Sequence, residues 1–292
     1  MSDWRAIARH IGTTTGEPFR PGPPRQVGGG CINTTLRLGD GARDFFIKLN
    51  GARHLPMFEA EAEGLAELDR TAAIRVPHPI CHGTTGGQSY LVLEHIELRG
   101  SGDARAAGRR LARLHHSTQE RFGWHRDNTI GSTPQRNTPQ RDWITFWREQ
   151  RLGFQLDLAE RNGFTGRALQ RGRLLLELFP ALIDHQPRPS LIHGDLWGGN
   201  LAYDTRGGPV IYDPATYYGD REAELAMTEL FGGLGRDFYH AYQEVWPLAP
   251  GYSTRKILYN LYHILNHVNL FGGGYAGQAA SMIERLLAEL GQ

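Results

Sequence analysis

The side chains best placed to do chemistry lie in the segment His193-Gly194-Asp195-Leu196-Trp197-Gly198-Gly199-Asn200. An aspartate and an asparagine stand five residues apart, and a histidine precedes the aspartate by two. This spacing is typical of a phosphotransferase catalytic loop. In such a loop the aspartate, here Asp195, takes the proton of the attacking hydroxyl, and the asparagine, here Asn200, binds magnesium. The alternative is a turn in which both side chains only cap backbone groups.

A second acidic residue, Asp213, follows at the interval that this chemistry requires. The segments 201–203 and 209–212 are predicted to form a small hairpin that ends at Asp213-Pro214-Ala215. Kinases hold their main magnesium ligand at this place, as the first residue of a three-residue motif. An aspartate before proline is also common in plain turns. Its occurrence after the loop of Asp195 favours metal binding.

Three glycines precede these groups in the chain. Gly28, Gly29 and Gly30 lie between two predicted strands, whereas a Walker or dinucleotide-binding motif would open a helix. This context favours a loop that covers phosphates, although any tight hairpin uses such glycines.

Lys48 and Glu61 are the expected partners of that loop. Lys48 lies on the predicted strand 44–49, and Glu61 lies on the predicted helix 56–70. A lysine that binds the α- and β-phosphates and is held by a helix glutamate is a usual kinase pair. Glu59 and Glu63 compete with Glu61 for this role.

The composition limits the kinds of protein that this chain can be. With 292 residues, 40% of them hydrophobic, and a net charge of +1, it can bury a large core and has no excess charge for nucleic acid or an anionic membrane. No apolar run is long enough to cross a bilayer, so we expect a cytoplasmic protein. Of the 32 basic residues only Lys48 and Lys256 are lysine, which singles out Lys48 because arginine serves elsewhere.

The elements that must position these residues change in kind near residue 97. Strands dominate before it and helices after it, which indicates two lobes in an α+β fold, 1–96 and 97–292. The segment 122–141 is predicted to be a long functional loop. The predicted helices of the second lobe span 103–116, 141–160, 166–184, 221–231, 235–246, 254–269 and 276–290.

With these motifs the chain resembles the fructosamine (ketosamine) kinases, a branch of the aminoglycoside phosphotransferases with a bilobal protein-kinase-like fold. The resemblance extends over nearly the whole chain. It rests on the segments 28–33, Val76-Pro77-His78-Pro79, Leu91-Val92-Leu93-Glu94, 193–200 with its tryptophan, 213–222 and 260–272.

The resemblance implies ATP-dependent phosphorylation of the 3-hydroxyl of fructosamines or ribulosamines, which leads to deglycation. It implies that Asp195 is the base, that Asn200 and Asp213 bind Mg²⁺, and that Lys48 and Glu61 hold the phosphates. Backbone groups of Glu94 and Ile96 would hold adenine at the lobe hinge.

Three residues raise further hypotheses. Trp197 could pack its indole face on the sugar, or be a buried aromatic residue. Cys31, in the glycine loop, could be a reactive thiol that forms a redox-linked homodimer, or a small apolar filler. Glu224 stands where the family has aspartate, which puts the contact of this carboxylate with the catalytic loop in doubt.

Two other interpretations remain open. One is a kinase of the same fold that acts on an aminoglycoside or an amino alcohol, and the other is a pseudokinase that binds nucleotide without catalysis. The helical spacing of His263 and His267 places two imidazoles on one face, but no neighbouring acid completes a metal site.

Overall fold

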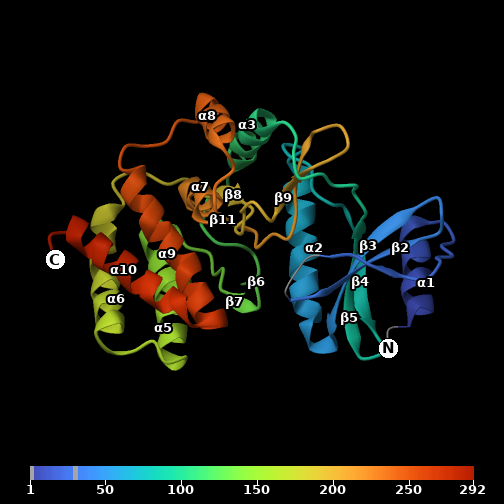
Figure 1. The fold of residues 1–292 in the computed structure, drawn as a ribbon, viewed down its shortest axis with the longest axis horizontal. Coiled ribbons are helices and arrows are strands. Elements are labelled where there is room, and N and C mark those ends of the chain that lie inside the picture. The colour runs from blue at the N-terminus through green and yellow to red at the C-terminus, as the bar shows by residue number, and fades with distance from the viewer. Residues whose placement is uncertain (1–2, 29–31) are drawn as a thin grey trace. The chain divides into compact units, whose positions relative to one another are not determined.

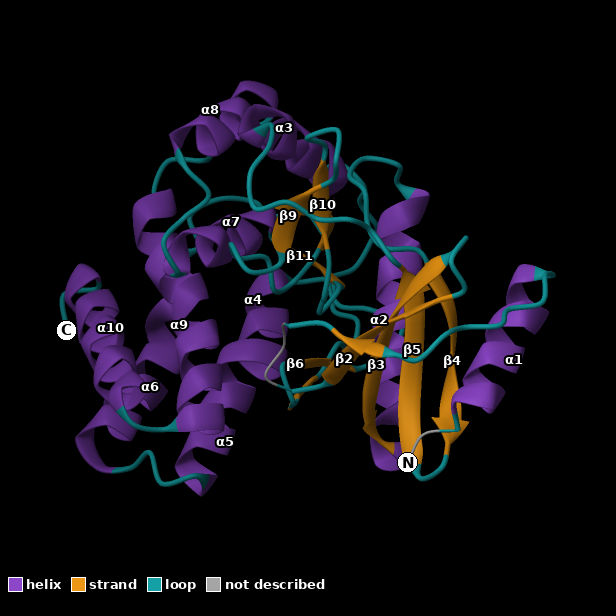
Figure 2. Ribbon diagram, turned by 45° about the vertical axis from the view of Figure 1, so that its right-hand side comes forward, coloured by secondary structure: helices purple, strands orange, loops and turns teal. Residues whose placement is uncertain are grey.

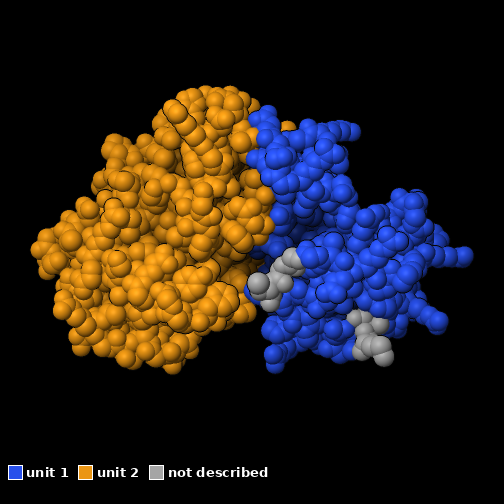
Figure 3. Space-filling model, viewed as in Figure 1, with its two compact units in different colours: residues 1–103, 202–214 blue, residues 104–201, 215–292 orange. Residues whose placement is uncertain are grey.

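The computed structural model describes residues 3–28 and 32–292, and its contacts divide the chain into two compact units. Unit 1 is Met1–Asp103 with Ala202–Pro214, and unit 2 is Ala104–Leu201 with Ala215–Gln292 (Figure 3). The predicted division between residues 96 and 97 differs from these two units in two respects. The first break falls after Asp103, and the segment 202–214, predicted to belong to the second lobe, is part of unit 1.

Unit 1 is built on a five-stranded antiparallel sheet with the strand order β1-β2-β3-β5-β4 (Figures 1 and 2). The edge strand β4 was not predicted. The elements are α1 Trp4–Thr15, β1 Arg25–Gln26, β2 Thr34–Gly39, β3 Asp44–Gly51, the short 3₁₀ helix η1 Ala52–His54, α2 Leu55–Arg70, β4 Pro79–Thr85 and β5 Gln88–Glu94.

The two faces of this sheet are covered by different helices. Helix α1, capped by the Asp3 carboxylate at the N–H groups of Arg5 and Ala6, packs on one face, and α2 packs on the other (Figures 1 and 2). Because side chains alternate along a strand, Ile47 and Leu49 of β3 join the α1 core. Lys48, between them, therefore points to the α2 face.

A hairpin from late in the chain completes unit 1. Its strands, β9 Leu201–Tyr203 and β10 Pro209–Ile211, form a separate two-stranded sheet. Arg99 and Tyr203 exchange backbone hydrogen bonds of 2.7 and 2.9 Å, and the N–H of Ile211 donates to the carbonyl of Arg75 at 3.0 Å. These backbone pairings are the reason why residues 202–214 belong with the N-terminal part.

Unit 2 consists mainly of helices, with α9 packed against α5, α7 and α10, and α3 packed against α8 (Figure 1). Its elements are α3 Ala104–His115, β6 Asn128–Ile130, β7 Thr133–Gln135, α4 Trp143–Phe146, the π-helical turn η2 Trp147–Leu152, α5 Gly153–Arg161, α6 Gly166–Leu178, η3 Phe179–Leu182, β8 Ser190–Ile192, β11 Tyr217–Gly219, α7 Arg221–Leu230, α8 Arg236–Val245, α9 Tyr252–Phe271 and α10 Gly274–Glu289.

Two stretches of unit 2 differ from their predictions. The expected long loop 122–141 contains the hairpin β6–β7, whose Gln135 amide donates to the Asn128 side chain at 2.8 Å. The expected helix 141–160 is divided by a π-helical turn. In such a turn the backbone hydrogen bonds join residues five positions apart, whereas in an α-helix they join residues four apart. None of the described helices combines the length and the apolar character needed to cross a bilayer.

Candidate active site

The predicted lysine pair is present in unit 1. The Nζ of Lys48 donates to Glu61 Oε1 at 2.5 Å and to Asp213 Oδ1 at 2.5 Å, and only 4% of this lysine is exposed. Burial disfavours the charged ammonium, but the charges of Asp213 and Glu61 outweigh it and raise the pKa of Lys48. Lys48 is therefore a fixed cation at neutral pH.

The geometry of α2 selects among the three competing glutamates. Glu61 is the one that contacts the ammonium of Lys48, and its side chain is 10% exposed. Glu63, on the other hand, is exposed. Successive helix residues are about 100° apart, so residues two positions away from Glu61 leave the sheet-facing side.

The contact between Asp213 and Lys48 was not predicted from the sequence. Asp213 follows β10, and its backbone has φ = 58°, a left-handed conformation that is uncommon outside glycine. Strain of this kind is concentrated at functional sites. The Asp213 side chain is 43% exposed, so its second carboxylate oxygen can face a ligand.

The predicted nucleotide contacts at Glu94 and Ile96 are only partly available. The N–H of Glu94 donates to the carbonyl of His78 at 2.8 Å, and its carboxylate pairs with Arg75 at 2.6 Å. The N–H of Glu94 is therefore not available to adenine, and the carbonyl of Glu94 is the backbone group that could meet it. Ile96 lies beyond the end of β5, and its contact with adenine stays a prediction.

The glycine loop joins β1 to β2. Gly28 lies at its start, just after Val27, whose N–H donates to the carbonyl of Thr35 at 3.1 Å. Gly29, Gly30 and Cys31 lie outside the described residues, so the predictions made for them, including the redox-linked homodimer, stay predictions. The other cysteine, Cys81, is buried, and burial raises the pKa of its thiol to about 12.

The predicted catalytic loop lies in unit 2, directly after β8. Asn200 is 7% exposed, and its amide nitrogen donates to the backbone carbonyl of Asp195 at 2.9 Å. This bond orients the amide, and its oxygen is the atom left to face a metal. The imidazole Nδ1 of His193 is 3.3 Å from the N–H of Asp195, so the histidine helps to shape the loop from inside.

The carboxylate of Glu224 holds this loop by its backbone. Its Oε1 accepts from the N–H of Gly194 at 2.7 Å, and its Oε2 accepts from the N–H of His193 at 2.9 Å. The doubt about this longer side chain is thereby resolved, because Glu224 still receives the backbone donors. Gly194 has φ = 83° and lies so close to the carbonyl of Ala215 that no Cβ would fit there.

A buried network behind Glu224 was missed by sequence reasoning. His115 Nε2 lies 3.0 Å from Glu224 Oε2, and His115 Nδ1 lies 2.7 Å from the hydroxyl of Tyr242. Burial lowers the pKa of His115, although Glu224 opposes this effect. Burial also disfavours charge on Glu224, but hydrogen bonds from His115 and from the backbone lower its pKa. The only sequence signal was a histidine at the end of a predicted helix.

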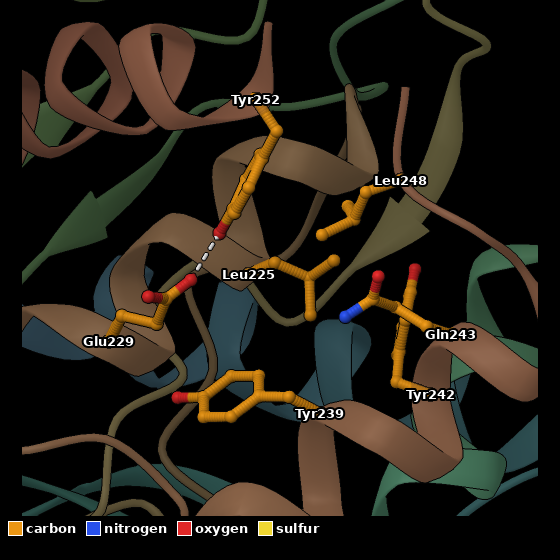
Figure 4. A pocket seen from close by; sticks show the side chains of 7 residues that line it. All are labelled: Leu225, Glu229, Tyr239, Tyr242, Gln243, Leu248 and Tyr252. Atoms are coloured by element: carbon orange, nitrogen blue, oxygen red, sulfur yellow. Dashed lines mark hydrogen bonds between the residues drawn. The ribbon is translucent and has the colours of Figure 1, made fainter. Parts of the chain in front are cut away.

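Tyr242 also lines a cavity of about 290 Å³ (Figure 4). The hydroxyl of Tyr252 donates to Glu229 in its wall at 2.7 Å. The residues that line it are Leu225, Glu229, Tyr239, Tyr242, Gln243, Leu248 and Tyr252. No predicted site residue lines this cavity.

Metal binding through histidine finds no support at His263 and His267. Within the described residues, the one group of side chains with metal-ligand spacing is His185, Asp220 and Glu222. Arg255 already donates to Glu222 at 2.7 Å, and Tyr259 donates to Asp220 at 2.6 Å in the same group. We interpret it as a neutralised structural network.

The fold and the two groups of residues define a protein of the protein-kinase-like class. A choline kinase of Streptococcus pneumoniae has a TM-score of 0.64 over 98% of this chain and 99% of its own, and its 14% identity shows the fold alone. The structure of a candidate fructosamine-3-kinase from Haemophilus somnus has a TM-score of 0.89, 28% identity and 97% coverage of both chains.

The sequence comparisons define the family. The model of the family described as fructosamine kinase matches residues 3–289, and the chain therefore belongs to the fructosamine kinase family. A probable ketoamine kinase of Synechocystis is 52% identical over 97% of both chains. A chloroplastic protein-ribulosamine 3-kinase of Arabidopsis thaliana is 46% identical over 90% of this chain and 82% of its own. The resemblance stated from the motifs is confirmed.

Proposed function

We propose that this protein uses ATP to phosphorylate the 3-hydroxyl of ketosamines, the fructosamine and ribulosamine adducts of amines. The match of the fructosamine kinase family to residues 3–289 carries this proposal. The names of the relatives from Synechocystis and Arabidopsis support the same substrate class. The phosphorylated adduct is labile, so the physiological outcome is deglycation in the cytoplasm.

Asp195 is the proposed general base. Its carboxylate accepts the proton of the 3-hydroxyl while that oxygen bonds to the γ-phosphorus, and the bond from the γ-phosphorus to ADP breaks. The loop that carries Asp195 is held by Glu224 through two backbone N–H groups, so the base needs little reorganisation.

Asn200 and Asp213 are the proposed ligands of Mg²⁺. One amide oxygen and one carboxylate suit this ion, which takes a few protein oxygens and keeps its other positions for phosphates and water. The Asn200 amide nitrogen is engaged at Asp195, which leaves its oxygen for the ion, and the Asp213 side chain is 43% exposed. When bound, Mg²⁺ neutralises charge on the phosphates.

Lys48 is proposed to bind the α- and β-phosphates, with Glu61 holding the ammonium in place. Glu61 and Asp213 each accept one of the three N–H donors of the ammonium, so the third donor can bind a phosphate. Gly28, Gly29 and Gly30 would cover the phosphates with backbone N–H groups, and adenine would meet backbone groups at Glu94 and Ile96.

An ADP-release assay tests the proposal. Fructosyl-lysine, ribulosyl-lysine, free fructose, choline and an aminoglycoside are offered with ATP and Mg²⁺, and the wild type is compared with Asp195→Asn. We expect turnover of the two ketosamines and a fall in kcat of roughly 10²-fold or more in the variant.

Two outcomes would contradict the proposal. Turnover of the aminoglycoside or choline without the ketosamines would indicate another small-molecule kinase. Binding of ATP with no turnover of any acceptor would indicate a pseudokinase. An Asp195→Asn variant as active as the wild type would show that Asp195 is not the base, and would leave the proposed reaction itself untouched.

A further inference from the structure

A chain of aromatic side chains leads away from the catalytic loop on the surface of unit 2. Trp197, two residues after Asp195, contacts Phe231 with ring centroids 6.0 Å apart. Phe231 contacts His267 at 5.2 Å, and His267 contacts Phe271 at 5.5 Å and Tyr275 at 4.9 Å. We call these five residues the aromatic track.

The aromatic track is exposed, although most large apolar side chains of the chain are buried. Trp197 is 38% exposed, Phe231 is 37% exposed and Phe271 is 63% exposed. Exposed apolar residues scattered singly need no explanation, but a contiguous group marks a binding surface. Here three of them are linked ring to ring through His267, which indicates a surface that is used.

Helix α9 gives the track its direction. His263, His267 and Phe271 are four residues apart and lie on one face of α9. Their exposure increases along the helix, from a buried His263 to a half-buried His267 and an exposed Phe271. This face of α9 is therefore buried at His263 and reaches the surface at Phe271. At the surface the track can hold a group that projects outward.

The inner end of the track is fixed at the catalytic loop. The indole of Trp197 packs over Gly199 so closely that no Cβ would fit between them. The position of the ring is therefore set by the same loop that carries Asp195. A substrate with its 3-hydroxyl at Asp195 has its amine only a few bonds away, so the amine and its carrier are the part that meets these rings.

The chemistry of a ketosamine matches the track. Its secondary amine is protonated at neutral pH, and a cation over an aromatic face is attracted by the ring quadrupole. The lysine stem beyond it is apolar and suits the next rings. The distances between successive ring centroids from Trp197 to Phe271 add up to more than the length of two extended residues, roughly 7 Å. The track is therefore longer than a single sugar.

From these observations we infer that the aromatic track is the subsite for the carrier of the ketosamine, and that its occupant is a peptide segment bearing the glycated lysine. The inference rests on the proposed function. It assigns Trp197 and Phe231 to the amine and the lysine stem, and Phe271 and Tyr275 to the flanking residues of the peptide.

The test compares two substrates that differ only in the carrier. Free Nε-fructosyl-lysine and a short neutral peptide with the same fructosyl-lysine at its centre are assayed for kcat and KM by ADP release. The variants are Phe231→Ala, Phe271→Ala and Phe271→Leu. Val245→Ala is the matched control, because Val245 on α8 is also an exposed apolar residue, at 37%, and lies outside the track.

We expect Phe271→Ala to raise the KM for the peptide about 5- to 30-fold, with kcat changed less than about 2-fold. The KM for free fructosyl-lysine changes less than about 3-fold, and Phe271→Leu gives an intermediate value because it keeps apolar area without a ring. Phe231→Ala, nearer to the loop, raises KM for both substrates. Val245→Ala behaves as the wild type, and thermal unfolding shows that every variant is folded.

The failure of this inference differs from failure of the proposed function. A peptide KM that stays the same in Phe271→Ala, or that rises equally for both substrates, overturns the carrier subsite while ketosamine kinase activity stands. A wild type that turns over neither ketosamine overturns the proposed function, and the subsite with it.

Discussion

At the scale of single residues, Lys48 is the group on which the proposed nucleotide site depends. It is one of two lysines in a chain rich in arginine, and it is buried between two carboxylates. A compact ammonium fits this place because three donors on one nitrogen can serve Glu61, Asp213 and a phosphate. The planar guanidinium of arginine is larger and spreads its donors over a fork.

Exchange of each lysine for arginine tests this argument. We expect Lys48→Arg to lower kcat/KM for ATP by about 10²-fold, because the longer fork cannot keep both carboxylate contacts and meet the phosphates. Lys256→Arg is the control, since Lys256 is 33% exposed and pairs with Glu229. Kinetics with varied ATP measure the effect. Equal activity of the two variants would contradict a special role for Lys48.

At the scale of elements, the catalytic loop is held in shape by a helix. Helix α7 begins at the cap residue Asp220, whose carboxylate accepts from the N–H of Glu222, and its first turn places Glu224 beneath the loop. The side chain of Glu224 is buried and receives two backbone N–H groups and His115. Helix α7 thus fixes the conformation of the catalytic loop.

Glu224→Gln tests that support. An amide keeps one acceptor oxygen but turns a donor toward the second backbone N–H, so one hydrogen bond is lost in a buried place at a cost of about 1–3 kcal/mol of stability. We expect kcat to fall by about 10-fold or more while KM for ATP changes little. Urea unfolding and steady-state kinetics measure both effects.

Glu229→Gln is the matched control on the same helix, where the carboxylate contacts Tyr252 and Lys256 and not the loop. It should leave kcat within about 2-fold of the wild type. If the two variants lost activity equally, Glu224 would have no specific role in positioning the loop.

At the scale of the whole molecule, the path of the chain brings a late segment into unit 1. The chain leaves unit 2 after the catalytic loop, enters unit 1 as the hairpin β9–β10, and returns to unit 2 after Asp213. The hairpin is held in unit 1 by Arg75 and Arg99 through backbone hydrogen bonds. As a result the proposed metal ligand Asp213 lies beside Lys48, although 165 residues separate the two in sequence.

The pH dependence of stability is a second property of the whole molecule. Burial lowers the pKa of His263 to about 3 from 6.5, and burial also lowers the pKa of His115. His263 therefore stays neutral in the folded state between these two pH values, whereas the unfolded chain takes up its proton as the pH falls below 6.5. Stability is therefore highest above 6.5 and falls with pH, by about 1.4 kcal/mol per pH unit for His263 alone between about 6.5 and 3.

His263→Gln should make this dependence shallower, measured as the free energy of unfolding in urea at pH 7.5, 5.5 and 4.5. A slope as steep in His263→Gln as in the wild type would show that this histidine does not link protons to folding.

Local patterns in the sequence were sufficient for most of the helices and for the family. The candidate site residues stand in short motifs that can be identified without knowing the fold. These are the spacing of Asp195 and Asn200, the retained Lys48 and the motif at Asp213. Helices such as 221–231 and 254–269 were predicted to within a few residues of α7 and α9, because their apolar periodicity and capping residues are local as well.

What the tertiary structure alone decided is which distant groups meet. The choice of Glu61 over its neighbours depends on how α2 lies on the sheet, and the placement of the hairpin 202–214 depends on backbone pairing with Arg75 and Arg99. The support of the loop by Glu224 and the track from Trp197 to Phe271 also join residues far apart in the chain. Such contacts are set by the packing of distant segments, which the local spacing of residues does not fix.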